Sequence, residues 1–340
     1  MKKKLTRKDI AKAAGVSPST VSRALSDSEL LPAKTIQMVK KVAAKMGYQP
    51  NFLARRLATN KSFHLGFVLP PASPRKGPLQ VSYYSTLLDA VVTQADKRGY
   101  SVSVHPQDLG GKTMVKNCRE LVNSSQLDGL VITGLTQDSE IPGLLKKRKI
   151  PFIVIGAVSE NKKDYYVAGN PLPAIREMLN CLEDRGYKRL FFVVGNTDYY
   201  HARVQRDSLF QAIEESSINL EKVLYGNYSR RSGYHAAASI HSQEKNRPGD
   251  CVFLSNDRMA CGYYRYCYEN SIVIPDEIGL IGSDNDEEAF SLFPQLCTIS
   301  QSRMEMGREA VNLLIDKLEK KKGGKRSLLL PKTFLFKESL

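Results

Sequence analysis

Apolar residues recur at intervals of three and four along three short segments near the start of the chain. This spacing predicts three short amphipathic helices in the first fifty residues. Their apolar positions are Ile10, Ala11 and Ala14, then Val21 and Leu25, then Ile36, Val39, Val42, Ala43 and Met46. Gly15 follows the first stripe and Gly47 follows the third, and glycine at such a position is a common helix stop.

Two helix starts in this region have recognisable caps. Thr6 is followed three positions later by Asp9, which is the spacing of a capping box. Ser17 is a good N-cap for the second helix, and Pro18 suits its first helical position. Two short helices joined by a tight turn that contains glycine predict a helix-turn-helix, a DNA-binding motif.

From residue 64 onward the pattern changes to apolar runs of strand length separated by helical stretches. The runs are 64–70, 100–106, 127–134, 151–157, 189–196, 251–257 and 279–283, and the clearest helical stretches are 83–98, 173–184, 257–269 and 303–319. A last strand signal lies near Leu328 to Phe336. Regular alternation of strand and helix predicts an α/β fold of parallel sheets covered by helices on both faces. The length of this region favours two lobes over one large sheet.

The positive charge is concentrated at the start of the chain. Residues 1–62 hold fourteen Lys or Arg against three Asp or Glu, whereas the whole chain has a net charge of +15. A short module with such an excess indicates a polyanionic partner, and nucleic acid is the one that a helix-turn-helix would bind. We therefore expect residues 1–50 to form a DNA-binding headpiece, 51–62 a hinge helix and linker, and 63–340 the core.

Other sequence features narrow the class of protein. The chain has no apolar run long enough to span a membrane, and its first residues lack the apolar stretch of a signal peptide, so we expect a cytoplasmic protein. The six cysteines show no C-x-x-C spacing, which favours free buried thiols and predicts neither a metal site nor a cofactor. No motif of a hydrolase, kinase, metalloprotease or dinucleotide-binding enzyme is present, so we do not expect an enzyme.

Several segments resemble the lactose-repressor/galactose-repressor family of bacterial transcription regulators. In the headpiece these are residues 6–25, Tyr48-Gln-Pro-Asn51 and Ala54-Arg-Arg-Leu57. In the core they include Leu127-Asp-Gly-Leu-Val, Arg185-Gly-Tyr-Lys-Arg-Leu190, Ser255-Asn-Asp-Arg-Met-Ala260 and residues 274–284. The resemblance implies a two-lobed core like that of periplasmic sugar-binding proteins, with a ligand between the lobes. A periplasmic solute-binding protein would share this core but would not need residues 1–60.

The resemblance also assigns residues to DNA. It places Pro18, Ser19 and Arg23 against base edges in the major groove, and the fork of Arg23 suits a guanine edge, although a phosphate contact is the alternative. It gives the role of positioning on the DNA backbone to Ser17, Thr20, Ser22 and Tyr48. In the hinge it marks Asn51 and Ala54, and it makes Leu57 a wedge for the minor groove. Ser26 and Pro32 depart from the family, which usually has Asn and a Ser or Thr cap there.

For the core, the resemblance implies an effector cleft. Its predicted residues are Tyr83, Tyr84, Arg206, Tyr228, Asn256 and Asp284. Aromatic faces together with carboxylate, amide and guanidinium groups suit a sugar, which we expect as the effector. Packing of the tyrosines and capping by Asp284 are the alternatives. Gly169 replaces an Asp that is common in the family, and Leu209 stands in the place of a glycine.

The resemblance further implies a homodimer that binds double-stranded operator DNA, most simply as a repressor. Four tyrosines between Tyr263 and Tyr268 fit the core and the dimer contact better than a cofactor site. No apolar heptad follows Phe336 that could join two dimers. A regulator of the catabolite-control type, whose effector is a partner protein, is the alternative function. The sequence leaves open the identity of the effector and whether it releases DNA or promotes binding.

Overall fold

A computed structural model of the 340-residue chain describes residues 5–25, 31–48, 61–71, 77–107, 112–159, 161, 163–243, 249–321 and 323–340. The chain divides into two compact units, Met1–Ser62 and Phe63–Leu340. Each unit has its own hydrophobic core, and each is described by itself below.

The described residues of the first unit form three helices: α1 (Arg7–Ala14), α2 (Pro18–Leu25) and α3 (Ala33–Lys45). The capping box is present, because the backbone N–H of Thr6 donates to Asp9 Oδ2 over 2.8 Å. Gly15 ends α1 in the left-handed region with a φ of 64°. The buried side chains form one small core of Ile10, Ala11, Val21, Ala24, Val39, Ala43 and Tyr48, and the other apolar residues that the helical spacing predicts are partly buried against it. The three predicted helices are therefore confirmed.

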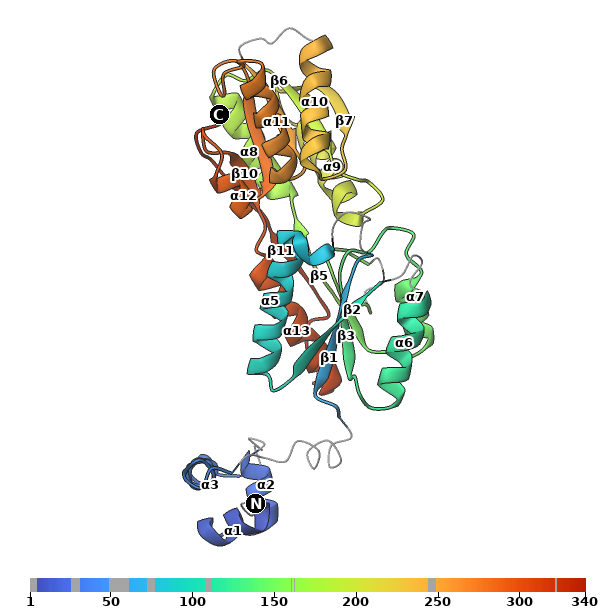
Figure 1. Cartoon of the computed structure of the whole chain (residues 1–340), viewed down its shortest axis with the longest axis vertical. Helices are drawn as coiled ribbons and strands as arrows, with labels where there is room; N and C mark the ends of the chain where they lie inside the picture. The colour runs from blue at the N-terminus through green and yellow to red at the C-terminus, as the bar shows by residue number, and fades with distance from the viewer. Residues whose placement is uncertain are drawn as a thin grey trace. The chain divides into compact units, whose positions relative to one another are not determined.

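The second unit contains two six-stranded sheets, each at the centre of one lobe. The N-lobe sheet has the order β11-β5-β4-β3-β1-β2, and its strand pairs are all parallel. Its strands are β1 (His64–Leu69), β2 (Ser101–Pro106), β3 (Gly129–Ile132), β4 (Phe152–Ile155), β5 (Tyr166–Asn170) and β11 (Ser327–Pro331). Helices α5 (Ser82–Lys97) and α13 (Arg303–Leu318) cover one face, and α6 (Lys112–Asn123) and α7 (Ile141–Lys147) cover the other (Figure 1). A 3-10 turn, Pro78–Gln80, precedes α5.

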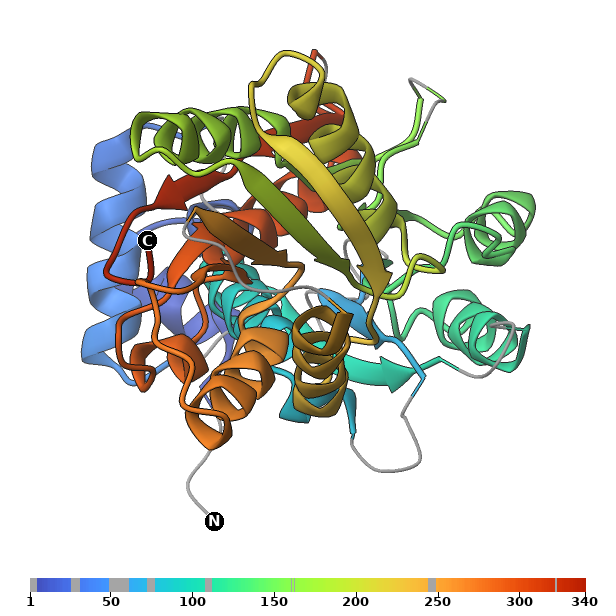
Figure 2. The ribbon, with the colours of Figure 1, turned by 90° about the horizontal axis from the view of Figure 1, so that it is seen from above.

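The C-lobe sheet has the order β12-β10-β9-β8-β6-β7. Its strands are β6 (Arg189–Val194), β7 (Asn219–Tyr225), β8 (Asp250–Leu254), β9 (Gly279–Asp284), β10 (Cys297–Ser300) and β12 (Thr333–Leu335). Its helices are α8 (Leu172–Asp184), α9 (Tyr200–Ile213), α10 (Arg230–Gln243), α11 (Asp257–Glu269) and the short α12 (Glu287–Phe290). Seen from above, the sheet lies between the layer of α8 and α9 and the layer of α10 and α11 (Figure 2). Both lobes thus have the predicted α/β layers.

The chain crosses between the lobes three times. The crossings follow β5 at Asn170, β10 at Ser300 and β11 at Pro331. The first and third lie side by side, because the N–H of Lys332 donates to the carbonyl oxygen of Asn170 over 3.0 Å. The second is next to them, because a Cβ added at Gly169 would lie 3.3 Å from Gln301 Cδ. The prediction of one strand near Leu328 to Phe336 is wrong. The apolar run is two strands, β11 and β12, which belong to different sheets because Lys332 between them makes the third crossing.

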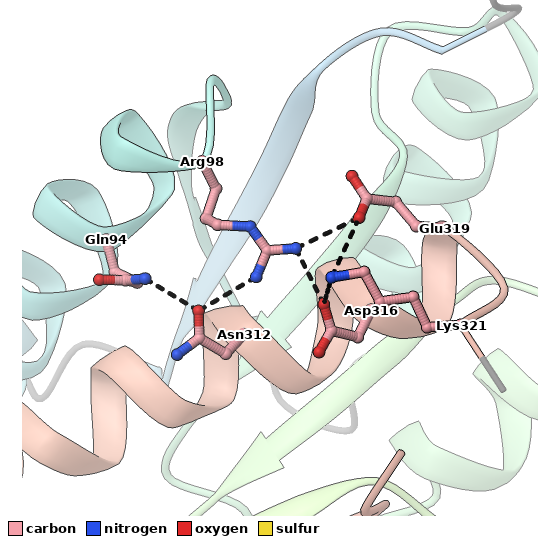
Figure 3. A network of polar contacts seen from close by, with 6 residues as sticks. All are labelled: Gln94, Arg98, Asn312, Asp316, Glu319 and Lys321. Atoms are coloured by element: carbon pink, nitrogen blue, oxygen red, sulfur yellow. Dashed lines mark hydrogen bonds and ion pairs between the residues drawn. The ribbon is translucent and has the colours of Figure 1, made fainter. Parts of the chain in front are cut away.

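A polar network fastens α5 to α13 on the outside of the N-lobe (Figure 3). Arg98, which caps the C-terminal end of α5, donates to Asp316 over 2.9 Å and to Glu319 over 3.3 Å. Asn312 accepts from Gln94 over 2.8 Å and from Arg98 over 3.2 Å. The helices α5 and α13 therefore pack as a pair. Apolar side chains are buried between them, and the polar network lies at the edge of this contact.

The described helices contain none that is long and apolar enough to cross a membrane. All six cysteines are free thiols, as the sequence predicts, and four of them are buried.

Candidate functional site

A cavity of about 820 Å³ opens where the carboxyl ends of the parallel strands of both lobes meet. Residues at the carboxyl ends of β1, β8 and β9, such as Pro70, Ser255 and Asp284, line it together with side chains of α5, α9 and α10. Gln301 and Lys332, from the second and third crossings, line it as well. Strand ends of open α/β sheets are the usual ligand position in such folds, and the volume lies in the range of small-molecule sites.

Aromatic rings from both lobes meet inside the cavity. The ring centroids of Tyr83 and Tyr84 in the N-lobe are 5.1 Å apart. His201 lies between the lobes, with its ring 6.3 Å from Tyr83, 5.6 Å from Tyr199 and 5.5 Å from Tyr228. His201 is exposed to the open cavity, and partial desolvation by the surrounding protein lowers the pKa of its imidazole below the ordinary value, so it is neutral at pH 7. The rings offer flat apolar faces of the kind on which a sugar or another planar surface can stack.

Five buried polar atoms of cavity-lining residues have no hydrogen-bond partner among the described residues. They are Gln205 Nε2, the hydroxyl of Tyr228, Ser255 Oγ, Arg258 Nε and Glu288 Oε2, of which the last is in an ion pair with Arg230. A buried donor or acceptor that stays unpaired costs about 1–3 kcal/mol. Atoms of this kind gathered on one wall therefore indicate a polar ligand that would pair with them.

Asp284 ends β9 at the cavity wall with a φ of 112°, a strained value for a residue with a side chain. Burial, with the neighbouring charge of Asp286, raises the pKa of Asp284 to about 7, against the opposite effect of Lys332 and Arg303. Arg303, the first residue of α13, donates to the carbonyl oxygen of Asp284 over 3.2 Å and to the carboxylate of Asp286. At pH 7 the carboxyl group of Asp284 is therefore present in both its protonated and its ionised form, so it can donate or accept a hydrogen bond.

Asp257, next to the cavity, is fully buried and is not predicted by the sequence. Thr298 Oγ1 donates to its Oδ1 over 2.7 Å, and the N–H of Asp286 donates to its Oδ2 over 2.8 Å. Burial and the charge of Asp284 raise its pKa well above the usual value. Asp257 therefore fixes the loop after β9, on which Asp284 and Asp286 lie.

Tyr228 and Asn256 both line the cavity. Tyr228 has a φ of 63°, and its ring lies directly over Gly195, where an added Cβ would be 2.0 Å from Tyr228 Cζ. Asn256 caps α11, because its Oδ1 accepts from the N–H of Met259 over 2.9 Å. Its Nδ2 donates to the carbonyl oxygen of Tyr228 over 3.3 Å, so Asn256 also holds Tyr228 in place.

The structure does not bring Arg206 into the cavity, although the sequence places it there. Its Nε and Nη2 donate to the neighbouring Asp207 over 2.9 and 2.7 Å, outside the cavity lining. Successive residues of a helix point about 100° apart, and on α9 it is Gln205 that faces the cavity. Gln205, His201, Ser255, Arg258, Gln301 and Lys332 are cavity residues that the sequence reasoning missed.

In the first unit, α2 carries most of the residues predicted to contact DNA. Pro18, Ser19 and Arg23 are exposed, and Ser17 caps the helix by accepting from the N–H of Thr20 over 3.1 Å. Ser22 accepts from Arg7 Nη1 over 3.3 Å. Tyr48 is buried in the small core. Asn51, Ala54, Leu57, Ser26 and most of the predicted hinge, 51–62, lie outside the described residues, and the DNA-contact roles stay predictions.

Within the described part of the chain, no group of three His, Cys, Asp or Glu side chains is placed to hold a metal ion.

Two family models match the chain. Residues 6–51 match "Bacterial regulatory proteins, lacI family", and residues 179–340 match "Periplasmic binding protein-like domain". The first match covers the helix-turn-helix, and the second covers the C-lobe from the middle of α8 onward together with α13 and β11 of the N-lobe.

Curated relatives match along nearly the whole chain. The HTH-type transcriptional repressor PurR of Haemophilus influenzae is 28% identical over 329 residues, which is 94% of this chain and 93% of the relative. The ribose operon repressor of Escherichia coli K12 is 26% identical over 318 residues, with 92% and 93% covered.

Solved structures share the fold. The lac repressor dimer bound to operator and the anti-inducer ONPF superposes with a TM-score of 0.73 at 23% identity, covering 99% of both chains. The complex of the transcriptional regulator CelR with cellobiose gives a TM-score of 0.73 at 20% identity, covering 99% of this chain and all of the other.

Proposed function

The chain belongs to the lacI family of bacterial regulatory proteins and is a DNA-binding transcriptional regulator, and from this premise we propose that it is a repressor whose operator affinity is set by a small effector in the cavity of the core. The observation that carries the proposal is one chain with both parts: a basic helix-turn-helix and a cavity with unpaired polar groups. Residues 1–50 act as the headpiece, 51–62 as the hinge and 63–340 as the effector core.

On the DNA side, the exposed face of α2 supports major-groove binding. Arg23 and Ser19 would reach base edges, while Ser17 and Thr20 would position the helix against the backbone. The excess of basic over acidic residues in 1–62 supplies the general attraction to phosphates. In this proposal the protein is a homodimer, so that two headpieces bind the two halves of a pseudo-palindromic operator.

On the effector side, the chemistry of the cavity favours a sugar. The rings of Tyr83, Tyr84 and Tyr228 offer stacking faces. Asp284, Gln205 and Ser255 supply the hydrogen bonds that hydroxyl groups require. The complex of CelR with cellobiose, a protein of the same fold, supports a sugar in such a cavity.

The coupling between the two sides would run along α5 and α13. Both helices begin at the cavity, where Arg303 Nη1 donates to Ser82 Oγ over 3.3 Å, and the network of Figure 3 ties their far ends together. Tyr100 follows α5, and its ring lies 5.4 Å from the ring of Phe63, the first residue of the core. A ligand that changes the lobe arrangement would therefore move the segment that leads to the headpieces.

The experiment starts from selection of bound duplexes from a random DNA library with the full chain, followed by affinity measurement on the selected duplex. We expect enrichment of a pseudo-palindrome, and an operator affinity that changes at least ten-fold with one member of a panel of sugars. Loss of the response in Asp284→Ala, with operator binding retained, would link the signal to the cavity.

Two results would contradict the proposal. One is the absence of any enriched duplex, which would remove the DNA-binding role. The other is an Asp284→Ala protein that responds normally to the true effector, which would mean that the signal enters elsewhere, as in a regulator controlled by a partner protein.

A further inference from the structure

Two helices of the C-lobe begin side by side at one end of the cavity. The first turns of α10 and α11 are in backbone contact, as their parallel course in Figure 1 suggests. An added Cβ would lie 1.9 Å from the carbonyl oxygen of Met259 at Gly233, and 1.8 Å from that of Arg230 at Gly262. Two glycines therefore allow this approach. The amino ends of two helices, each with a partial positive charge, then meet at one place.

Two arginines on these first turns line the cavity without a carboxylate partner among the described residues. Arg231 of α10 donates from Nε to the ring nitrogen of His235 over 3.1 Å. Arg258 of α11 has a buried Nε that finds no partner. A guanidinium group without a counter-charge at a ligand cavity indicates that the ligand supplies that charge.

A buried hydroxyl at the same place gives a second, independent indication. Ser255 directly precedes the cap of α11, is 5% exposed and has an Oγ without a partner on the cavity wall. Ser229 and Ser232, at the start of α10, also lie on this wall, but their hydroxyls already donate to Asn227 Oδ1 over 2.6 Å and to the carbonyl oxygen of Ser229 over 2.9 Å. Ser255 is therefore the serine of this wall whose hydroxyl is left for a ligand, and a hydroxyl donor at a helix start, next to arginines, is a group that binds phosphate oxygens.

Two carboxylates of this wall pair with arginines other than Arg231 and Arg258. Asp286 is bound by Arg303, and Glu288 lies 3.1 Å from Arg230 Nη2. The third carboxylate on the wall, Asp284, interacts with Lys332, and its pKa is raised to about 7. The positive charges of Arg231 and Arg258 are therefore not offset by a paired carboxylate among the described residues.

We propose that the effector is a phosphorylated sugar, with its phosphate bound by Arg231, Arg258 and Ser255 at the paired starts of α10 and α11. This inference rests on the proposed function, because it specifies the ligand of the same cavity. The sugar ring lies against the aromatic residues toward Tyr83 and Tyr228. A neutral sugar would leave both arginines and the serine hydroxyl unpaired, which costs binding free energy.

The test compares pairs of ligands by calorimetric titration of the full chain. The pairs are glucose and glucose 6-phosphate, fructose with its 1- and 6-phosphates, and ribose and ribose 5-phosphate, with gluconate as a carboxylate. Inorganic phosphate is tested through its effect on Tm, against chloride at equal ionic strength. We expect a phosphorylated sugar to bind at least ten-fold more tightly than its neutral partner, and phosphate to raise Tm.

Variants locate the phosphate. Arg258→Gln and Arg231→Gln should each weaken the phosphorylated ligand at least ten-fold, change binding of its neutral partner less than two-fold, and remove the effect of phosphate on Tm. Arg265→Gln is the matched control, because Arg265 lies two turns further along α11, is exposed and pairs with Glu269. Arg265→Gln should change the affinity for neither the phosphorylated ligand nor its neutral partner.

Equal binding of the neutral and phosphorylated partners, tighter binding of gluconate than of any phosphate, or no effect of any phosphate compound would overturn the inference. So would equal losses in Arg258→Gln and Arg265→Gln. A neutral sugar that alone changes operator affinity would overturn this inference and leave the proposed function standing. If a phosphorylated sugar binds as expected while no ligand changes operator affinity, this inference stands and the proposed function is contradicted.

Discussion

Arg303 donates a hydrogen bond of 3.2 Å to the backbone carbonyl oxygen of Asp284. The bond joins the first turn of α13 in the N-lobe to the end of β9 in the C-lobe. The same guanidinium group binds the carboxylate of Asp286, and both partners of this ion pair are largely buried. One side chain therefore fastens the loop that carries Asp284 to a helix of the opposite lobe.

Removal of this guanidinium group should destabilise the core. We expect Arg303→Gln to lower the free energy of unfolding by about 3 kcal/mol, because the carboxylate of Asp286 would stay buried without its partner. Urea denaturation followed by circular dichroism measures the change. Arg308→Gln on the same helix is the control: its ion pairs are exposed, so the loss should stay below about 1 kcal/mol. Equal losses in the two variants would contradict the role of Arg303.

Asp284 should make the stability of the core depend on pH. Its pKa is about 7 in the folded chain and near 3.8 in the unfolded chain, so the folded state binds the proton more tightly. Its contribution to the free energy of unfolding is therefore full below pH 4 and is lost as the pH rises to about 7, by at most about 1.4 kcal/mol per pH unit. Asp257, whose pKa is also raised, acts in the same direction.

His201 acts in the opposite direction, because its pKa falls from 6.5 to about 4 on folding. Its contribution is present above pH 6.5 and is lost as the pH falls to about 4. We expect the difference in unfolding free energy between the wild type and Asp284→Asn to fall with rising pH, and the difference between the wild type and His201→Gln to rise. Denaturation series from pH 4.5 to 7.5 measure both, and two flat difference curves would disprove the assignment.

Gly195 should be required for ligand binding and not for DNA binding. In Gly195→Ala the new methyl group would lie 2.0 Å from Tyr228 Cζ, so the ring must leave its position. We expect ligand affinity to fall at least ten-fold, while affinity for the operator without ligand changes little. Gly143→Ala is the control, because Gly143 lies in α7 with no atom within 4 Å of the added Cβ, and it should leave both affinities unchanged.

Arg23 should contribute to specificity for the DNA sequence. We expect Arg23→Ala to weaken operator binding by about 1–3 kcal/mol and to relax base choice at one position in each half-site. Competition with random DNA measures both effects. Lys12→Ala, which removes another exposed cation from the headpiece, should weaken operator and random DNA to the same extent. The same uniform loss in Arg23→Ala would make Arg23 a phosphate contact.

Local patterns predicted much of the fold. The pair Thr6 and Asp9 gives the start of α1, and the long apolar runs give the central strands, because both signals lie within a few residues of sequence. Three strands, β5, β7 and β10, were missed for a physical reason. In β7 half-buried and exposed residues are mixed without a strong apolar run, and β5 and β10 are five and four residues long, so none of the three has a pattern long enough to predict a strand.

The candidate site was predicted less well than the fold. Tyr83, Tyr228, Asn256 and Asp284 line the cavity, where the family resemblance placed them. Gln205 and Arg206 are neighbours in sequence, and the turn of α9 alone decides which one faces the cavity. Lys332 and Gln301 line the cavity because the lobe crossings come together in space, and no short sequence pattern predicts a contact between segments so far apart in the chain.

The crossings have a consequence for pharmacology. Gln301 and Lys332 belong both to the crossings that connect the lobes and to the wall of the cavity. A ligand in the cavity would therefore contact the crossings directly and would not need to act through the interior of either lobe. Compounds that share a sugar ring but differ in one substituent near these two residues would favour different arrangements of the lobes. We expect close chemical analogues to divide into agonists and antagonists of the same repressor, with similar affinities for the cavity and opposite effects on the operator.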